Sequence, residues 1–440
     1  MIDKLPKLLI VSRLNWDDHS NSNTLSNFFG NYDPDRIARI YIETKQPNTQ
    51  CCKLFYQISE IALIKKLLHP KLKTGKTITT SGITDKPSGH DEPDKSSRQE
   101  ASIMSYVRGH RSWIFTVMRD LLWLTGTWKS KDLRKFIHDF KPDVVWLDGS
   151  PLILMNRLNN FVRKQTQAPS VTFLMDDVYS YSSCPSTISK IYKFFLRRHV
   201  RKTVRHANHI FVSSPLMKQE YDKLFNINST FITKSYDFSN LVSRNTFKSE
   251  PLRLLYLGNI LIGRIDTLCE LARVIKEINK NGIRISLDIY TGDPIDEEHK
   301  ELLKVDGVSV NGLVPYNQVE NLIESYDVQV FVESLSKGRN KIARLSFSTK
   351  ILDYIKSGKC ILAIGPEEIA PIKYFIDEDA AVVARNRHEL KSSLIQLLKP
   401  ETVEQYAHKT VSCAKRLHDK KNMQHNIYKI LSETASQPLK

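Results

Sequence analysis

Two series of short apolar runs, each alternating with helically spaced hydrophobic positions, make up most of the chain. The first series predicts buried strands at 8–12, 143–147, 171–175 and 209–212, and the second predicts strands at 252–257, 285–291, 328–332 and 360–364. Helical spacing predicts helices at 24–29, 112–124, 131–140, 266–279, 317–325, 349–357 and 401–431. Strands that alternate with helices in this way indicate an α/β fold with two parallel, Rossmann-like sheets.

A polar stretch at 238–250 separates the two series and is typical of an interdomain linker. With 440 residues, the chain is long enough for two hydrophobic cores. We therefore predict one domain at 1–240, a second at 241–415, and a C-terminal helix and tail at 416–440. Residues 70–110 show no clear periodicity, and we expect a long exposed loop there.

The composition of the chain indicates its cellular compartment and whether it needs a cofactor. No run of about 18 apolar residues occurs and the chain does not begin like a signal peptide, so we expect a cytoplasmic protein. The six cysteines lack metal-ligand spacing, and we expect them to be reduced, with no metal ion and no other cofactor. The net charge of +17 calls for an anionic partner, which a membrane surface, a nucleic acid or an anionic substrate could provide.

The stretch 347–365 has the character of a phosphate-binding and ribose-binding segment. Ser348 and Thr349 are helix N-cap residue types, so free backbone N–H groups would face an anion, and Lys350 adds a mobile cation. Asp353 lies three residues after Lys350, on nearly the same helix face, where its carboxylate could accept hydrogen bonds from a diol. A capped helix with a Lys–Asp pair explains these residues equally well.

Acidic residues follow the strands of the first series. Asp148 comes after the strand at 143–147, and Asp176 and Asp177 come after the strand at 171–175. Ligands of open α/β sheets bind outside the carboxyl ends of the strands, so either Asp148 or Asp177 could act as a general base or orient a ligand hydroxyl. Helix capping or a salt bridge is the alternative, and it suits Asp176 better than Asp177.

Residues 188–205 combine seven Lys and Arg residues with interleaved apolar positions. Five of the cations, spaced three or four apart, would form a stripe along one helix face: Lys190, Lys193, Arg197, Arg201 and Arg205. No acidic residue occurs between Val178 and Gln219. Such a helix could lie along an anionic membrane, or it could simply be a solvated surface.

The order and spacing of several motifs resemble the GT-B glycosyltransferases, in particular the retaining family 4-type enzymes of bacterial surface polysaccharide synthesis. The segments 255–259 and 263–266 are similar to that family's donor-phosphate turn, and 310–315 is similar to its base-contacting loop. The segment from Ser348 to Gly358 is similar to its Ser-x-Lys-x-x-Glu-Tyr-x-x-x-Gly pattern. The resemblance implies two Rossmann-like domains that face across a cleft, with the acceptor side at 1–240 and the nucleotide-sugar side at 241–415. It also implies that Asn259 and Arg264 bind the donor.

Three positions depart from the family pattern. Of the family's two glutamates eight residues apart, only the second carboxylate is kept, because the positions hold Leu345 and Asp353. Cys269 stands where the family has a lysine, and Asp148 stands near where many relatives have a histidine. Lys350 could supply the missing positive charge. Retention of anomeric configuration follows from the resemblance alone.

Three hypotheses remain. The first is a metal-independent glycosyltransferase that uses a nucleotide-sugar and a glycan or polyprenyl-linked acceptor in cell-surface polysaccharide synthesis, bound peripherally at the inner face of the plasma membrane through 188–205. The second is a nucleotide-sugar epimerase of the same fold, although none of the 13 histidines falls at a clear strand end. The third is a non-catalytic basic binding protein. We expect no nucleic-acid partner, because no recognised module is present.

Overall fold

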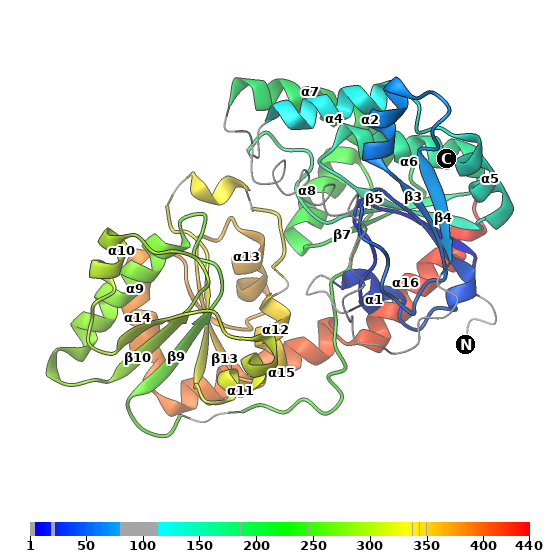
Figure 1. Cartoon of the computed structure of the whole chain (residues 1–440). Helices are drawn as coiled ribbons and strands as arrows, with labels where there is room; N and C mark the ends of the chain where they lie inside the picture. Colours follow the sequence, from blue (N-terminus) through cyan, green and yellow to red (C-terminus); the bar gives the residue numbers. More distant parts are fainter. Residues whose placement is uncertain are drawn as a thin grey trace. The chain divides into compact units, whose positions relative to one another are not determined.

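The computed structural model divides the chain into two compact units, each built on its own sheet (Figure 1). It describes residues 5–18, 23–79, 113–182, 184, 186–244, 247–336, 338–342, 344–348 and 350–440. Unit 1 comprises residues 1–213, 220–232 and 424–440, and unit 2 comprises 214–219 and 233–423. The sequence placed the boundary at 240/241, and the structure divides the chain at 232/233 and joins residues 424–440 to unit 1.

Unit 1 contains an eight-stranded sheet in the order β4-β3-β2-β1-β5-β6-β7-β8. All neighbouring strands are parallel except β3 and β4. Its strands are β1 (Leu8–Val11), β2 (Ile37–Tyr41), β3 (Leu54–Ile58), β4 (Gly75–Thr79), β5 (Val144–Gly149), β6 (Ser170–Leu174), β7 (His209–Val212) and β8 (Thr230–Phe231). Its helices are α1 (Thr24–Phe29), α2 (Glu60–Leu68), α4 (Trp113–Leu124), α5 (Lys131–Phe140), α6 (Ile153–Thr166) and α7 (Thr187–His206), with α8 (Pro215–Phe225) and α16 (Lys420–Ala435) lying mostly in this unit.

Unit 2 contains a fully parallel six-stranded sheet in the order β11-β10-β9-β12-β13-β14. Its strands are β9 (Leu252–Leu257), β10 (Ile285–Tyr290), β11 (Val308–Asn311), β12 (Val328–Val332), β13 (Cys360–Ile364) and β14 (Val382–Ala384). Its helices are α9 (Arg264–Ile278), α10 (Glu297–Leu302), α11 (Tyr316–Glu324), α12 (Lys350–Lys356), α13 (Ala370–Asp377), α14 (Arg387–Leu397) and α15 (Pro400–Leu417).

The hydrophobic pattern explains why these segments are strands. The strands β1, β12 and β13 are buried at every position, as continuous apolar runs in parallel sheets must be when helices cover both faces. The expected strands of both series are confirmed. The strands β2, β3, β4, β8, β11 and β14 were not predicted, and β4 occupies part of the stretch 70–110 that was expected to be a loop. The rest of that stretch lies outside the described residues.

The sheet order fixes where a ligand can bind. In unit 1 the chain reverses direction across the sheet between β1 and β5, and in unit 2 it does so between β9 and β12. Crevices at the carboxyl ends of strands beside such a switch point are the usual ligand sites of open α/β sheets. None of the helices in the described part of the chain combines the length and apolar character that crossing a bilayer requires.

Candidate functional site

The turn between β9 and α9 lies at the switch point of unit 2 and depends on two glycines. A Cβ atom on Gly258 would lie 2.0 Å from Lys350 Nζ, so only a glycine lets the ammonium group approach the backbone. Gly263 precedes α9 with a φ of +77°, and a Cβ atom there would lie 2.6 Å from Ser334 Oγ. The turn therefore presents bare backbone next to a cation, as a phosphate site requires.

Arg264 is the first residue of α9, and each of its three guanidinium nitrogens donates a hydrogen bond. Its Nε donates to Val332 O at 3.2 Å and its NH1 donates to Asn259 Oδ1 at 2.5 Å. Its NH2 lies 2.9 and 3.0 Å from the two carboxylate oxygens of Glu333. Burial disfavours the charged guanidinium, but the attraction of Glu333 outweighs burial and raises the pKa of Arg264. Arg264 thus joins the turn to the end of β12.

Lys350, by contrast, forms no ion pair with a carboxylate among the described residues. It begins α12, and burial, followed by the nearby charge of Arg264, lowers the pKa of its ammonium group. Ser348 lies just before it and is half-buried, while Thr349 lies outside the described residues. Lys350 is therefore the cation at this turn that is available to a ligand.

Asp353 lies one turn further along α12 and already has one partner. Its Oδ1 accepts a hydrogen bond from Tyr236 OH at 3.0 Å, and burial raises the pKa of its carboxyl group. The side chain borders a cavity of about 210 Å³ together with residues of α11 and α12, among them Ile323 and Lys356. One carboxylate oxygen remains for a ligand hydroxyl.

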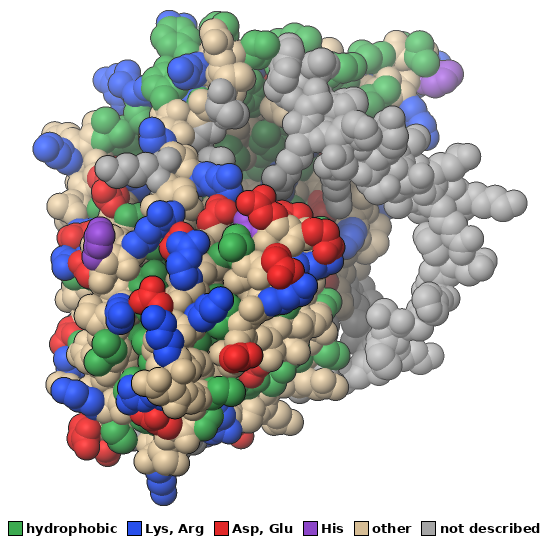
Figure 2. Space-filling model, turned by 90° about the vertical axis from the view of Figure 1, so that its left-hand side faces the viewer, with side chains coloured by type: hydrophobic (Ala, Val, Ile, Leu, Met, Phe, Trp, Pro, Cys, Tyr) green, Lys and Arg blue, Asp and Glu red, His purple; other side chains and the backbone are tan. Residues whose placement is uncertain are grey.

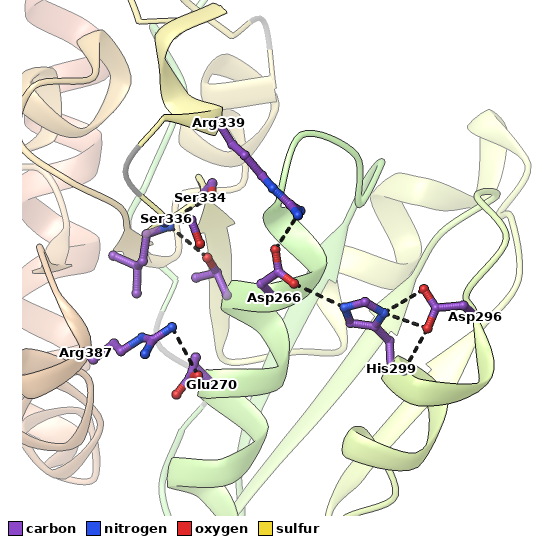
Figure 3. A network of polar contacts seen from close by, with 10 residues as sticks. Asp266, Glu270, Asp296, His299, Ser334, Ser336, Arg339 and Arg387 are labelled. Carbon is purple, nitrogen blue, oxygen red and sulfur yellow. Dashed lines mark hydrogen bonds and ion pairs between the residues drawn. The ribbon is translucent and has the colours of Figure 1, made fainter.

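A polar network holds the first turns of α9 in place (Figure 3). Asp266 Oδ2 accepts from Arg339 NH1 at 2.9 Å, and Asp266 Oδ1 lies 3.2 Å from His299 Nε2. The other ring nitrogen of His299 lies 2.7 and 2.8 Å from the carboxylate oxygens of Asp296. The backbone after β12 joins the same network, because Leu335 N donates to Thr267 Oγ1 at 3.0 Å. This bracing fixes the turn without using Lys350.

Glu333 is a candidate site residue of unit 2 that the sequence analysis did not name. It directly follows β12 and is mostly buried against Arg264. It supplies a carboxylate at the end of this strand, whereas position 345, where the resembled family has the first of its two glutamates, holds Leu345. The signal was present in the sequence: an acidic residue immediately after a predicted buried strand.

In unit 1, Asp148 lies at the end of β5, beside the switch point. Its Oδ1 accepts from Trp146 Nε1 at 3.1 Å, and burial raises the pKa of its carboxyl group to about 6 although the nearby Arg39 lowers it. Arg39 on β2 is itself buried and donates to Ser12 Oγ, with distances of 2.9 Å from Nε and 2.5 Å from NH2. A carboxyl group that titrates near neutrality at a strand end is suited to proton transfer.

Asp177, after β6, has a different setting. Its Oδ1 accepts from the backbone N–H of Tyr179 and Ser180, at 3.1 and 2.9 Å, and from Tyr221 OH at 2.8 Å. Burial would raise the pKa of this carboxyl group, but the hydrogen bonds of Ser180 and Tyr221 outweigh burial and lower it. These contacts shape the loop after β6, so Asp177 has less of its carboxylate left for a ligand than Asp148 has.

The predicted helix at 188–205 is confirmed as α7, but the predicted stripe of cations is wrong for two of its members. Lys193 is buried and donates from Nζ to Val178 O at 3.3 Å. The Arg197 guanidinium stacks on the rings of Tyr179 and Tyr181, at 4.1 and 4.5 Å from their centroids. The exposed cations of α7 are Lys190, Arg198, Arg201, Lys202 and Arg205.

The charges of unit 2 are arranged differently. Figure 2 shows Lys and Arg side chains interspersed with Asp and Glu over the side that carries α9, α10 and α14. Ion pairs join these helices, including Arg387 to Glu270 at 3.4 Å and Lys391 to Glu277 at 3.1 Å. On this face, positive charge is balanced by neighbouring carboxylates.

No protein-family model and no curated protein matches the sequence. Solved structures do match over nearly the whole chain. HepE from Anabaena, solved in complex with UDP-glucose, has a TM-score of 0.56 at 11% identity and covers 97% of this chain and 100% of its own. The lipopolysaccharide outer core galactosyltransferase WaaB has a TM-score of 0.58 at 11% identity, with 96% and 99% covered.

The chain has the GT-B fold. A third solved structure that matches this chain is a protein from Listeria monocytogenes described as a putative UDP-N-acetylglucosamine 2-epimerase. Its TM-score is 0.51 at 9% identity, and 99% of both chains is covered. Unit 2 corresponds to the domain that the family resemblance assigned to the nucleotide-sugar. Unit 1 corresponds to the domain that it assigned to the acceptor.

Proposed function

We propose that this protein is a metal-independent glycosyltransferase that moves a sugar from a nucleotide-sugar donor to a glycan or polyprenyl-linked acceptor. The observation that carries the proposal is the close approach of Lys350 Nζ to the Gly258 turn, at the switch point of unit 2 in a chain with the GT-B fold. Departure of a nucleoside diphosphate requires stabilisation of its negative charge by preorganised cations and backbone N–H groups. Lys350 and the bare turn provide both.

The other donor residues have supporting roles in this proposal. Asn259 and Arg264 hold the turn in shape through their mutual hydrogen bond, and Glu333 holds Arg264. Asp353 offers its second carboxylate oxygen to the ribose diol. Ser348 precedes α12 and contributes a backbone N–H group near the phosphates, and Thr349, which lies outside the described residues, is kept as a donor-binding candidate from the sequence alone.

We assign proton transfer from the acceptor hydroxyl, or orientation of a donor hydroxyl, to Asp148. Its carboxyl group has a pKa of about 6, so it is mostly ionised at neutral pH and can still accept a proton. Asp177 is the second candidate, and its hydrogen bonds to the loop after β6 make it the weaker base.

We also propose that the reaction belongs to cell-surface polysaccharide synthesis at a membrane, with peripheral association through residues 188–205. The exposed cations of α7 support this part of the proposal, because each Lys or Arg near an anionic bilayer contributes about 1 kcal/mol of attraction. Retention of anomeric configuration is expected from the family resemblance.

Donor titration tests the proposal. The purified protein is incubated with a panel of UDP- and GDP-sugars while unfolding is followed by circular dichroism, and the true donor at 100 times its Kd should stabilise the protein by about 2.7 kcal/mol. Release of nucleoside diphosphate on addition of glycan acceptors then tests transfer. If no nucleotide-sugar stabilises the protein, the proposal fails, and a non-catalytic basic binding protein becomes the better account.

An epimerase is the alternative that a specific observation favours, namely the match to the putative UDP-N-acetylglucosamine 2-epimerase. An epimerase would convert UDP-N-acetylglucosamine without an acceptor. Proton NMR of the nucleotide-sugar after incubation alone separates the two reactions, because a glycosyltransferase leaves the stereochemistry of the unreacted donor unchanged.

A further inference from the structure

A cavity of about 450 Å³ opens between α4, α6 and α7 of unit 1, away from the strand ends discussed above. Its lining combines aromatic side chains with cations and, within the described residues, includes no Asp or Glu. The cationic and titratable members are Lys129, Arg157, Lys164, His199 and Lys202, and the aromatic members are Trp123, Trp128 and Phe161.

Of the cations of this cavity, Arg157 interacts electrostatically with the carboxylate of Asp120 on α4. Among the described residues, no carboxylate forms an ion pair with Lys129, Arg157, Lys164 or Lys202. Burial, followed by the charges of Arg157 and Lys202, lowers the pKa of His199. A pocket with several unpaired cations and no acid is complementary to a phosphate group.

Helices of unit 1 near the cavity expose large apolar side chains. Helices α2, α4 and α7 run side by side (Figure 1), joined by the ion pair of Arg119 with Glu60 at 2.8 Å and by the hydrogen bond from Tyr192 OH to Asp120 at 2.7 Å. Large apolar side chains on all three helices are exposed: Ile64, Leu67, Leu68, Met118, Leu121, Leu124, Ile188, Ile191, Phe194 and Phe195. Leu124 also borders the cavity, and Phe195 lies one helical turn before His199.

We propose that this cavity binds the phosphate headgroup of an anionic phospholipid while the apolar side chains of α2, α4 and α7 enter the acyl region of the same leaflet. The proposal deepens the membrane association proposed above and does not depend on glycosyl transfer. Exposed apolar side chains beside a cationic pocket fit a lipid better than a nucleic acid or a soluble phosphate, because only a lipid offers an anion and a hydrocarbon layer together.

Vesicle sedimentation tests the proposal. Wild-type protein should bind phosphatidylglycerol vesicles and bind phosphatidylcholine vesicles only weakly. The double variant Lys164→Gln/Lys202→Gln should lose about 30-fold in affinity for phosphatidylglycerol vesicles, because two surface cations are removed. Lys276→Gln/Lys280→Gln makes the same charge change with exposed lysines of unit 2 and should bind as wild type does. Phe194→Ser/Phe195→Ser should also bind weakly.

Two results would overturn the proposal. One is equal vesicle binding by the pocket variant and the unit 2 control. The other is release of the wild type from vesicles by millimolar glycerol phosphate, if glycerol phosphate without vesicles also stabilises the protein against heat as much as the vesicles do. That result would identify a site for a soluble phosphate. Donor titration of all variants runs in parallel. Unchanged donor binding with lost vesicle binding separates this proposal from the proposed transferase activity.

Discussion

Lys350 and Arg264 are both cations beside the Gly258 turn, yet their surroundings give them different tasks. We expect Lys350→Ala to weaken binding of the donor nucleotide about 10-fold to 100-fold, because a charge-assisted hydrogen bond to phosphate is lost. Lys391→Ala is the matched control, since Lys391 is an exposed lysine of the same unit and pairs with Glu277 at 3.1 Å. Isothermal titration with the donor nucleotide measures both. Equal affinity of the two variants would remove Lys350 from the phosphate site.

Arg264 should matter for stability as well as for binding. Arg264→Ala leaves the mostly buried Glu333 carboxylate without its counter-charge, and breaking a buried pair in this way typically costs about 3 kcal/mol or more. Chemical denaturation followed by circular dichroism gives the free energy of unfolding. Adding Glu333→Gln to Arg264→Ala should recover part of the loss, whereas an unchanged or larger loss in the double variant would contradict this role of the ion pair.

Asp148 predicts a pH dependence. Because burial raises the pKa of its carboxyl group to about 6, the folded protein favours the protonated form, and this contribution to stability is lost as pH rises from about 4 through 6. Proton abstraction needs the ionised form, so kcat/KM should rise with pH and level off above about 6. In Asp148→Asn, kcat/KM should be much lower and should not rise with pH in this range. The variant should be at least as stable as wild type at pH 7. A wild-type profile without a limb near pH 6 would exclude Asp148 as the base.

At the scale of elements, sequence periodicity predicted most helices and strands but not which side chains of an element would be exposed. The helix α7 was predicted within about one residue at each end, because the spacing of its cations and apolar residues is a local signal. The burial of Lys193 and the stacking of Arg197 were not predictable, because they depend on the backbone of Val178 and on the rings of Tyr179 and Tyr181. The position of Glu333 directly after a predicted strand was a readable signal, but its ion pair with Arg264 was not predictable, since Arg264 lies 69 positions earlier in the chain.

This difference gives a prediction for α7. Lys193→Gln/Arg197→Gln removes two cations of the stripe that the sequence predicted, and it should change affinity for anionic vesicles by less than about 3-fold, because neither side chain faces solvent freely. Arg198→Gln/Arg201→Gln removes two exposed cations and should lower the affinity by about 30-fold. Vesicle sedimentation at low salt compares them. If the first pair had the larger effect, the periodic stripe would be the better guide to the membrane-facing surface.

At the scale of the whole molecule, two parallel sheets were predictable, because each strand carries its own apolar run. The order of the strands was not, because parallel neighbours such as β1 and β5 are more than 130 residues apart and no local pattern encodes their pairing. The position of the C-terminal helix was also hidden. Its contacts with the rest of unit 1 include hydrogen bonds from Gln424 Nε2 to Asn27 O at 2.7 Å and from Tyr428 OH to Phe28 O at 3.0 Å.

The last prediction follows from this position of α16 in unit 1. Leu431 is completely buried, so Leu431→Ala should destabilise unit 1 by about 2 to 5 kcal/mol through lost burial and a residual cavity. All five tryptophans of the chain, at positions 16, 113, 123, 128 and 146, belong to unit 1, so tryptophan fluorescence reports the unfolding of that unit. The fluorescence midpoint in urea should therefore fall for Leu431→Ala and stay unchanged for Lys429→Ala, an exposed position on the same helix. A Leu431→Ala midpoint equal to that of Lys429→Ala would mean that α16 contributes nothing to the stability of unit 1.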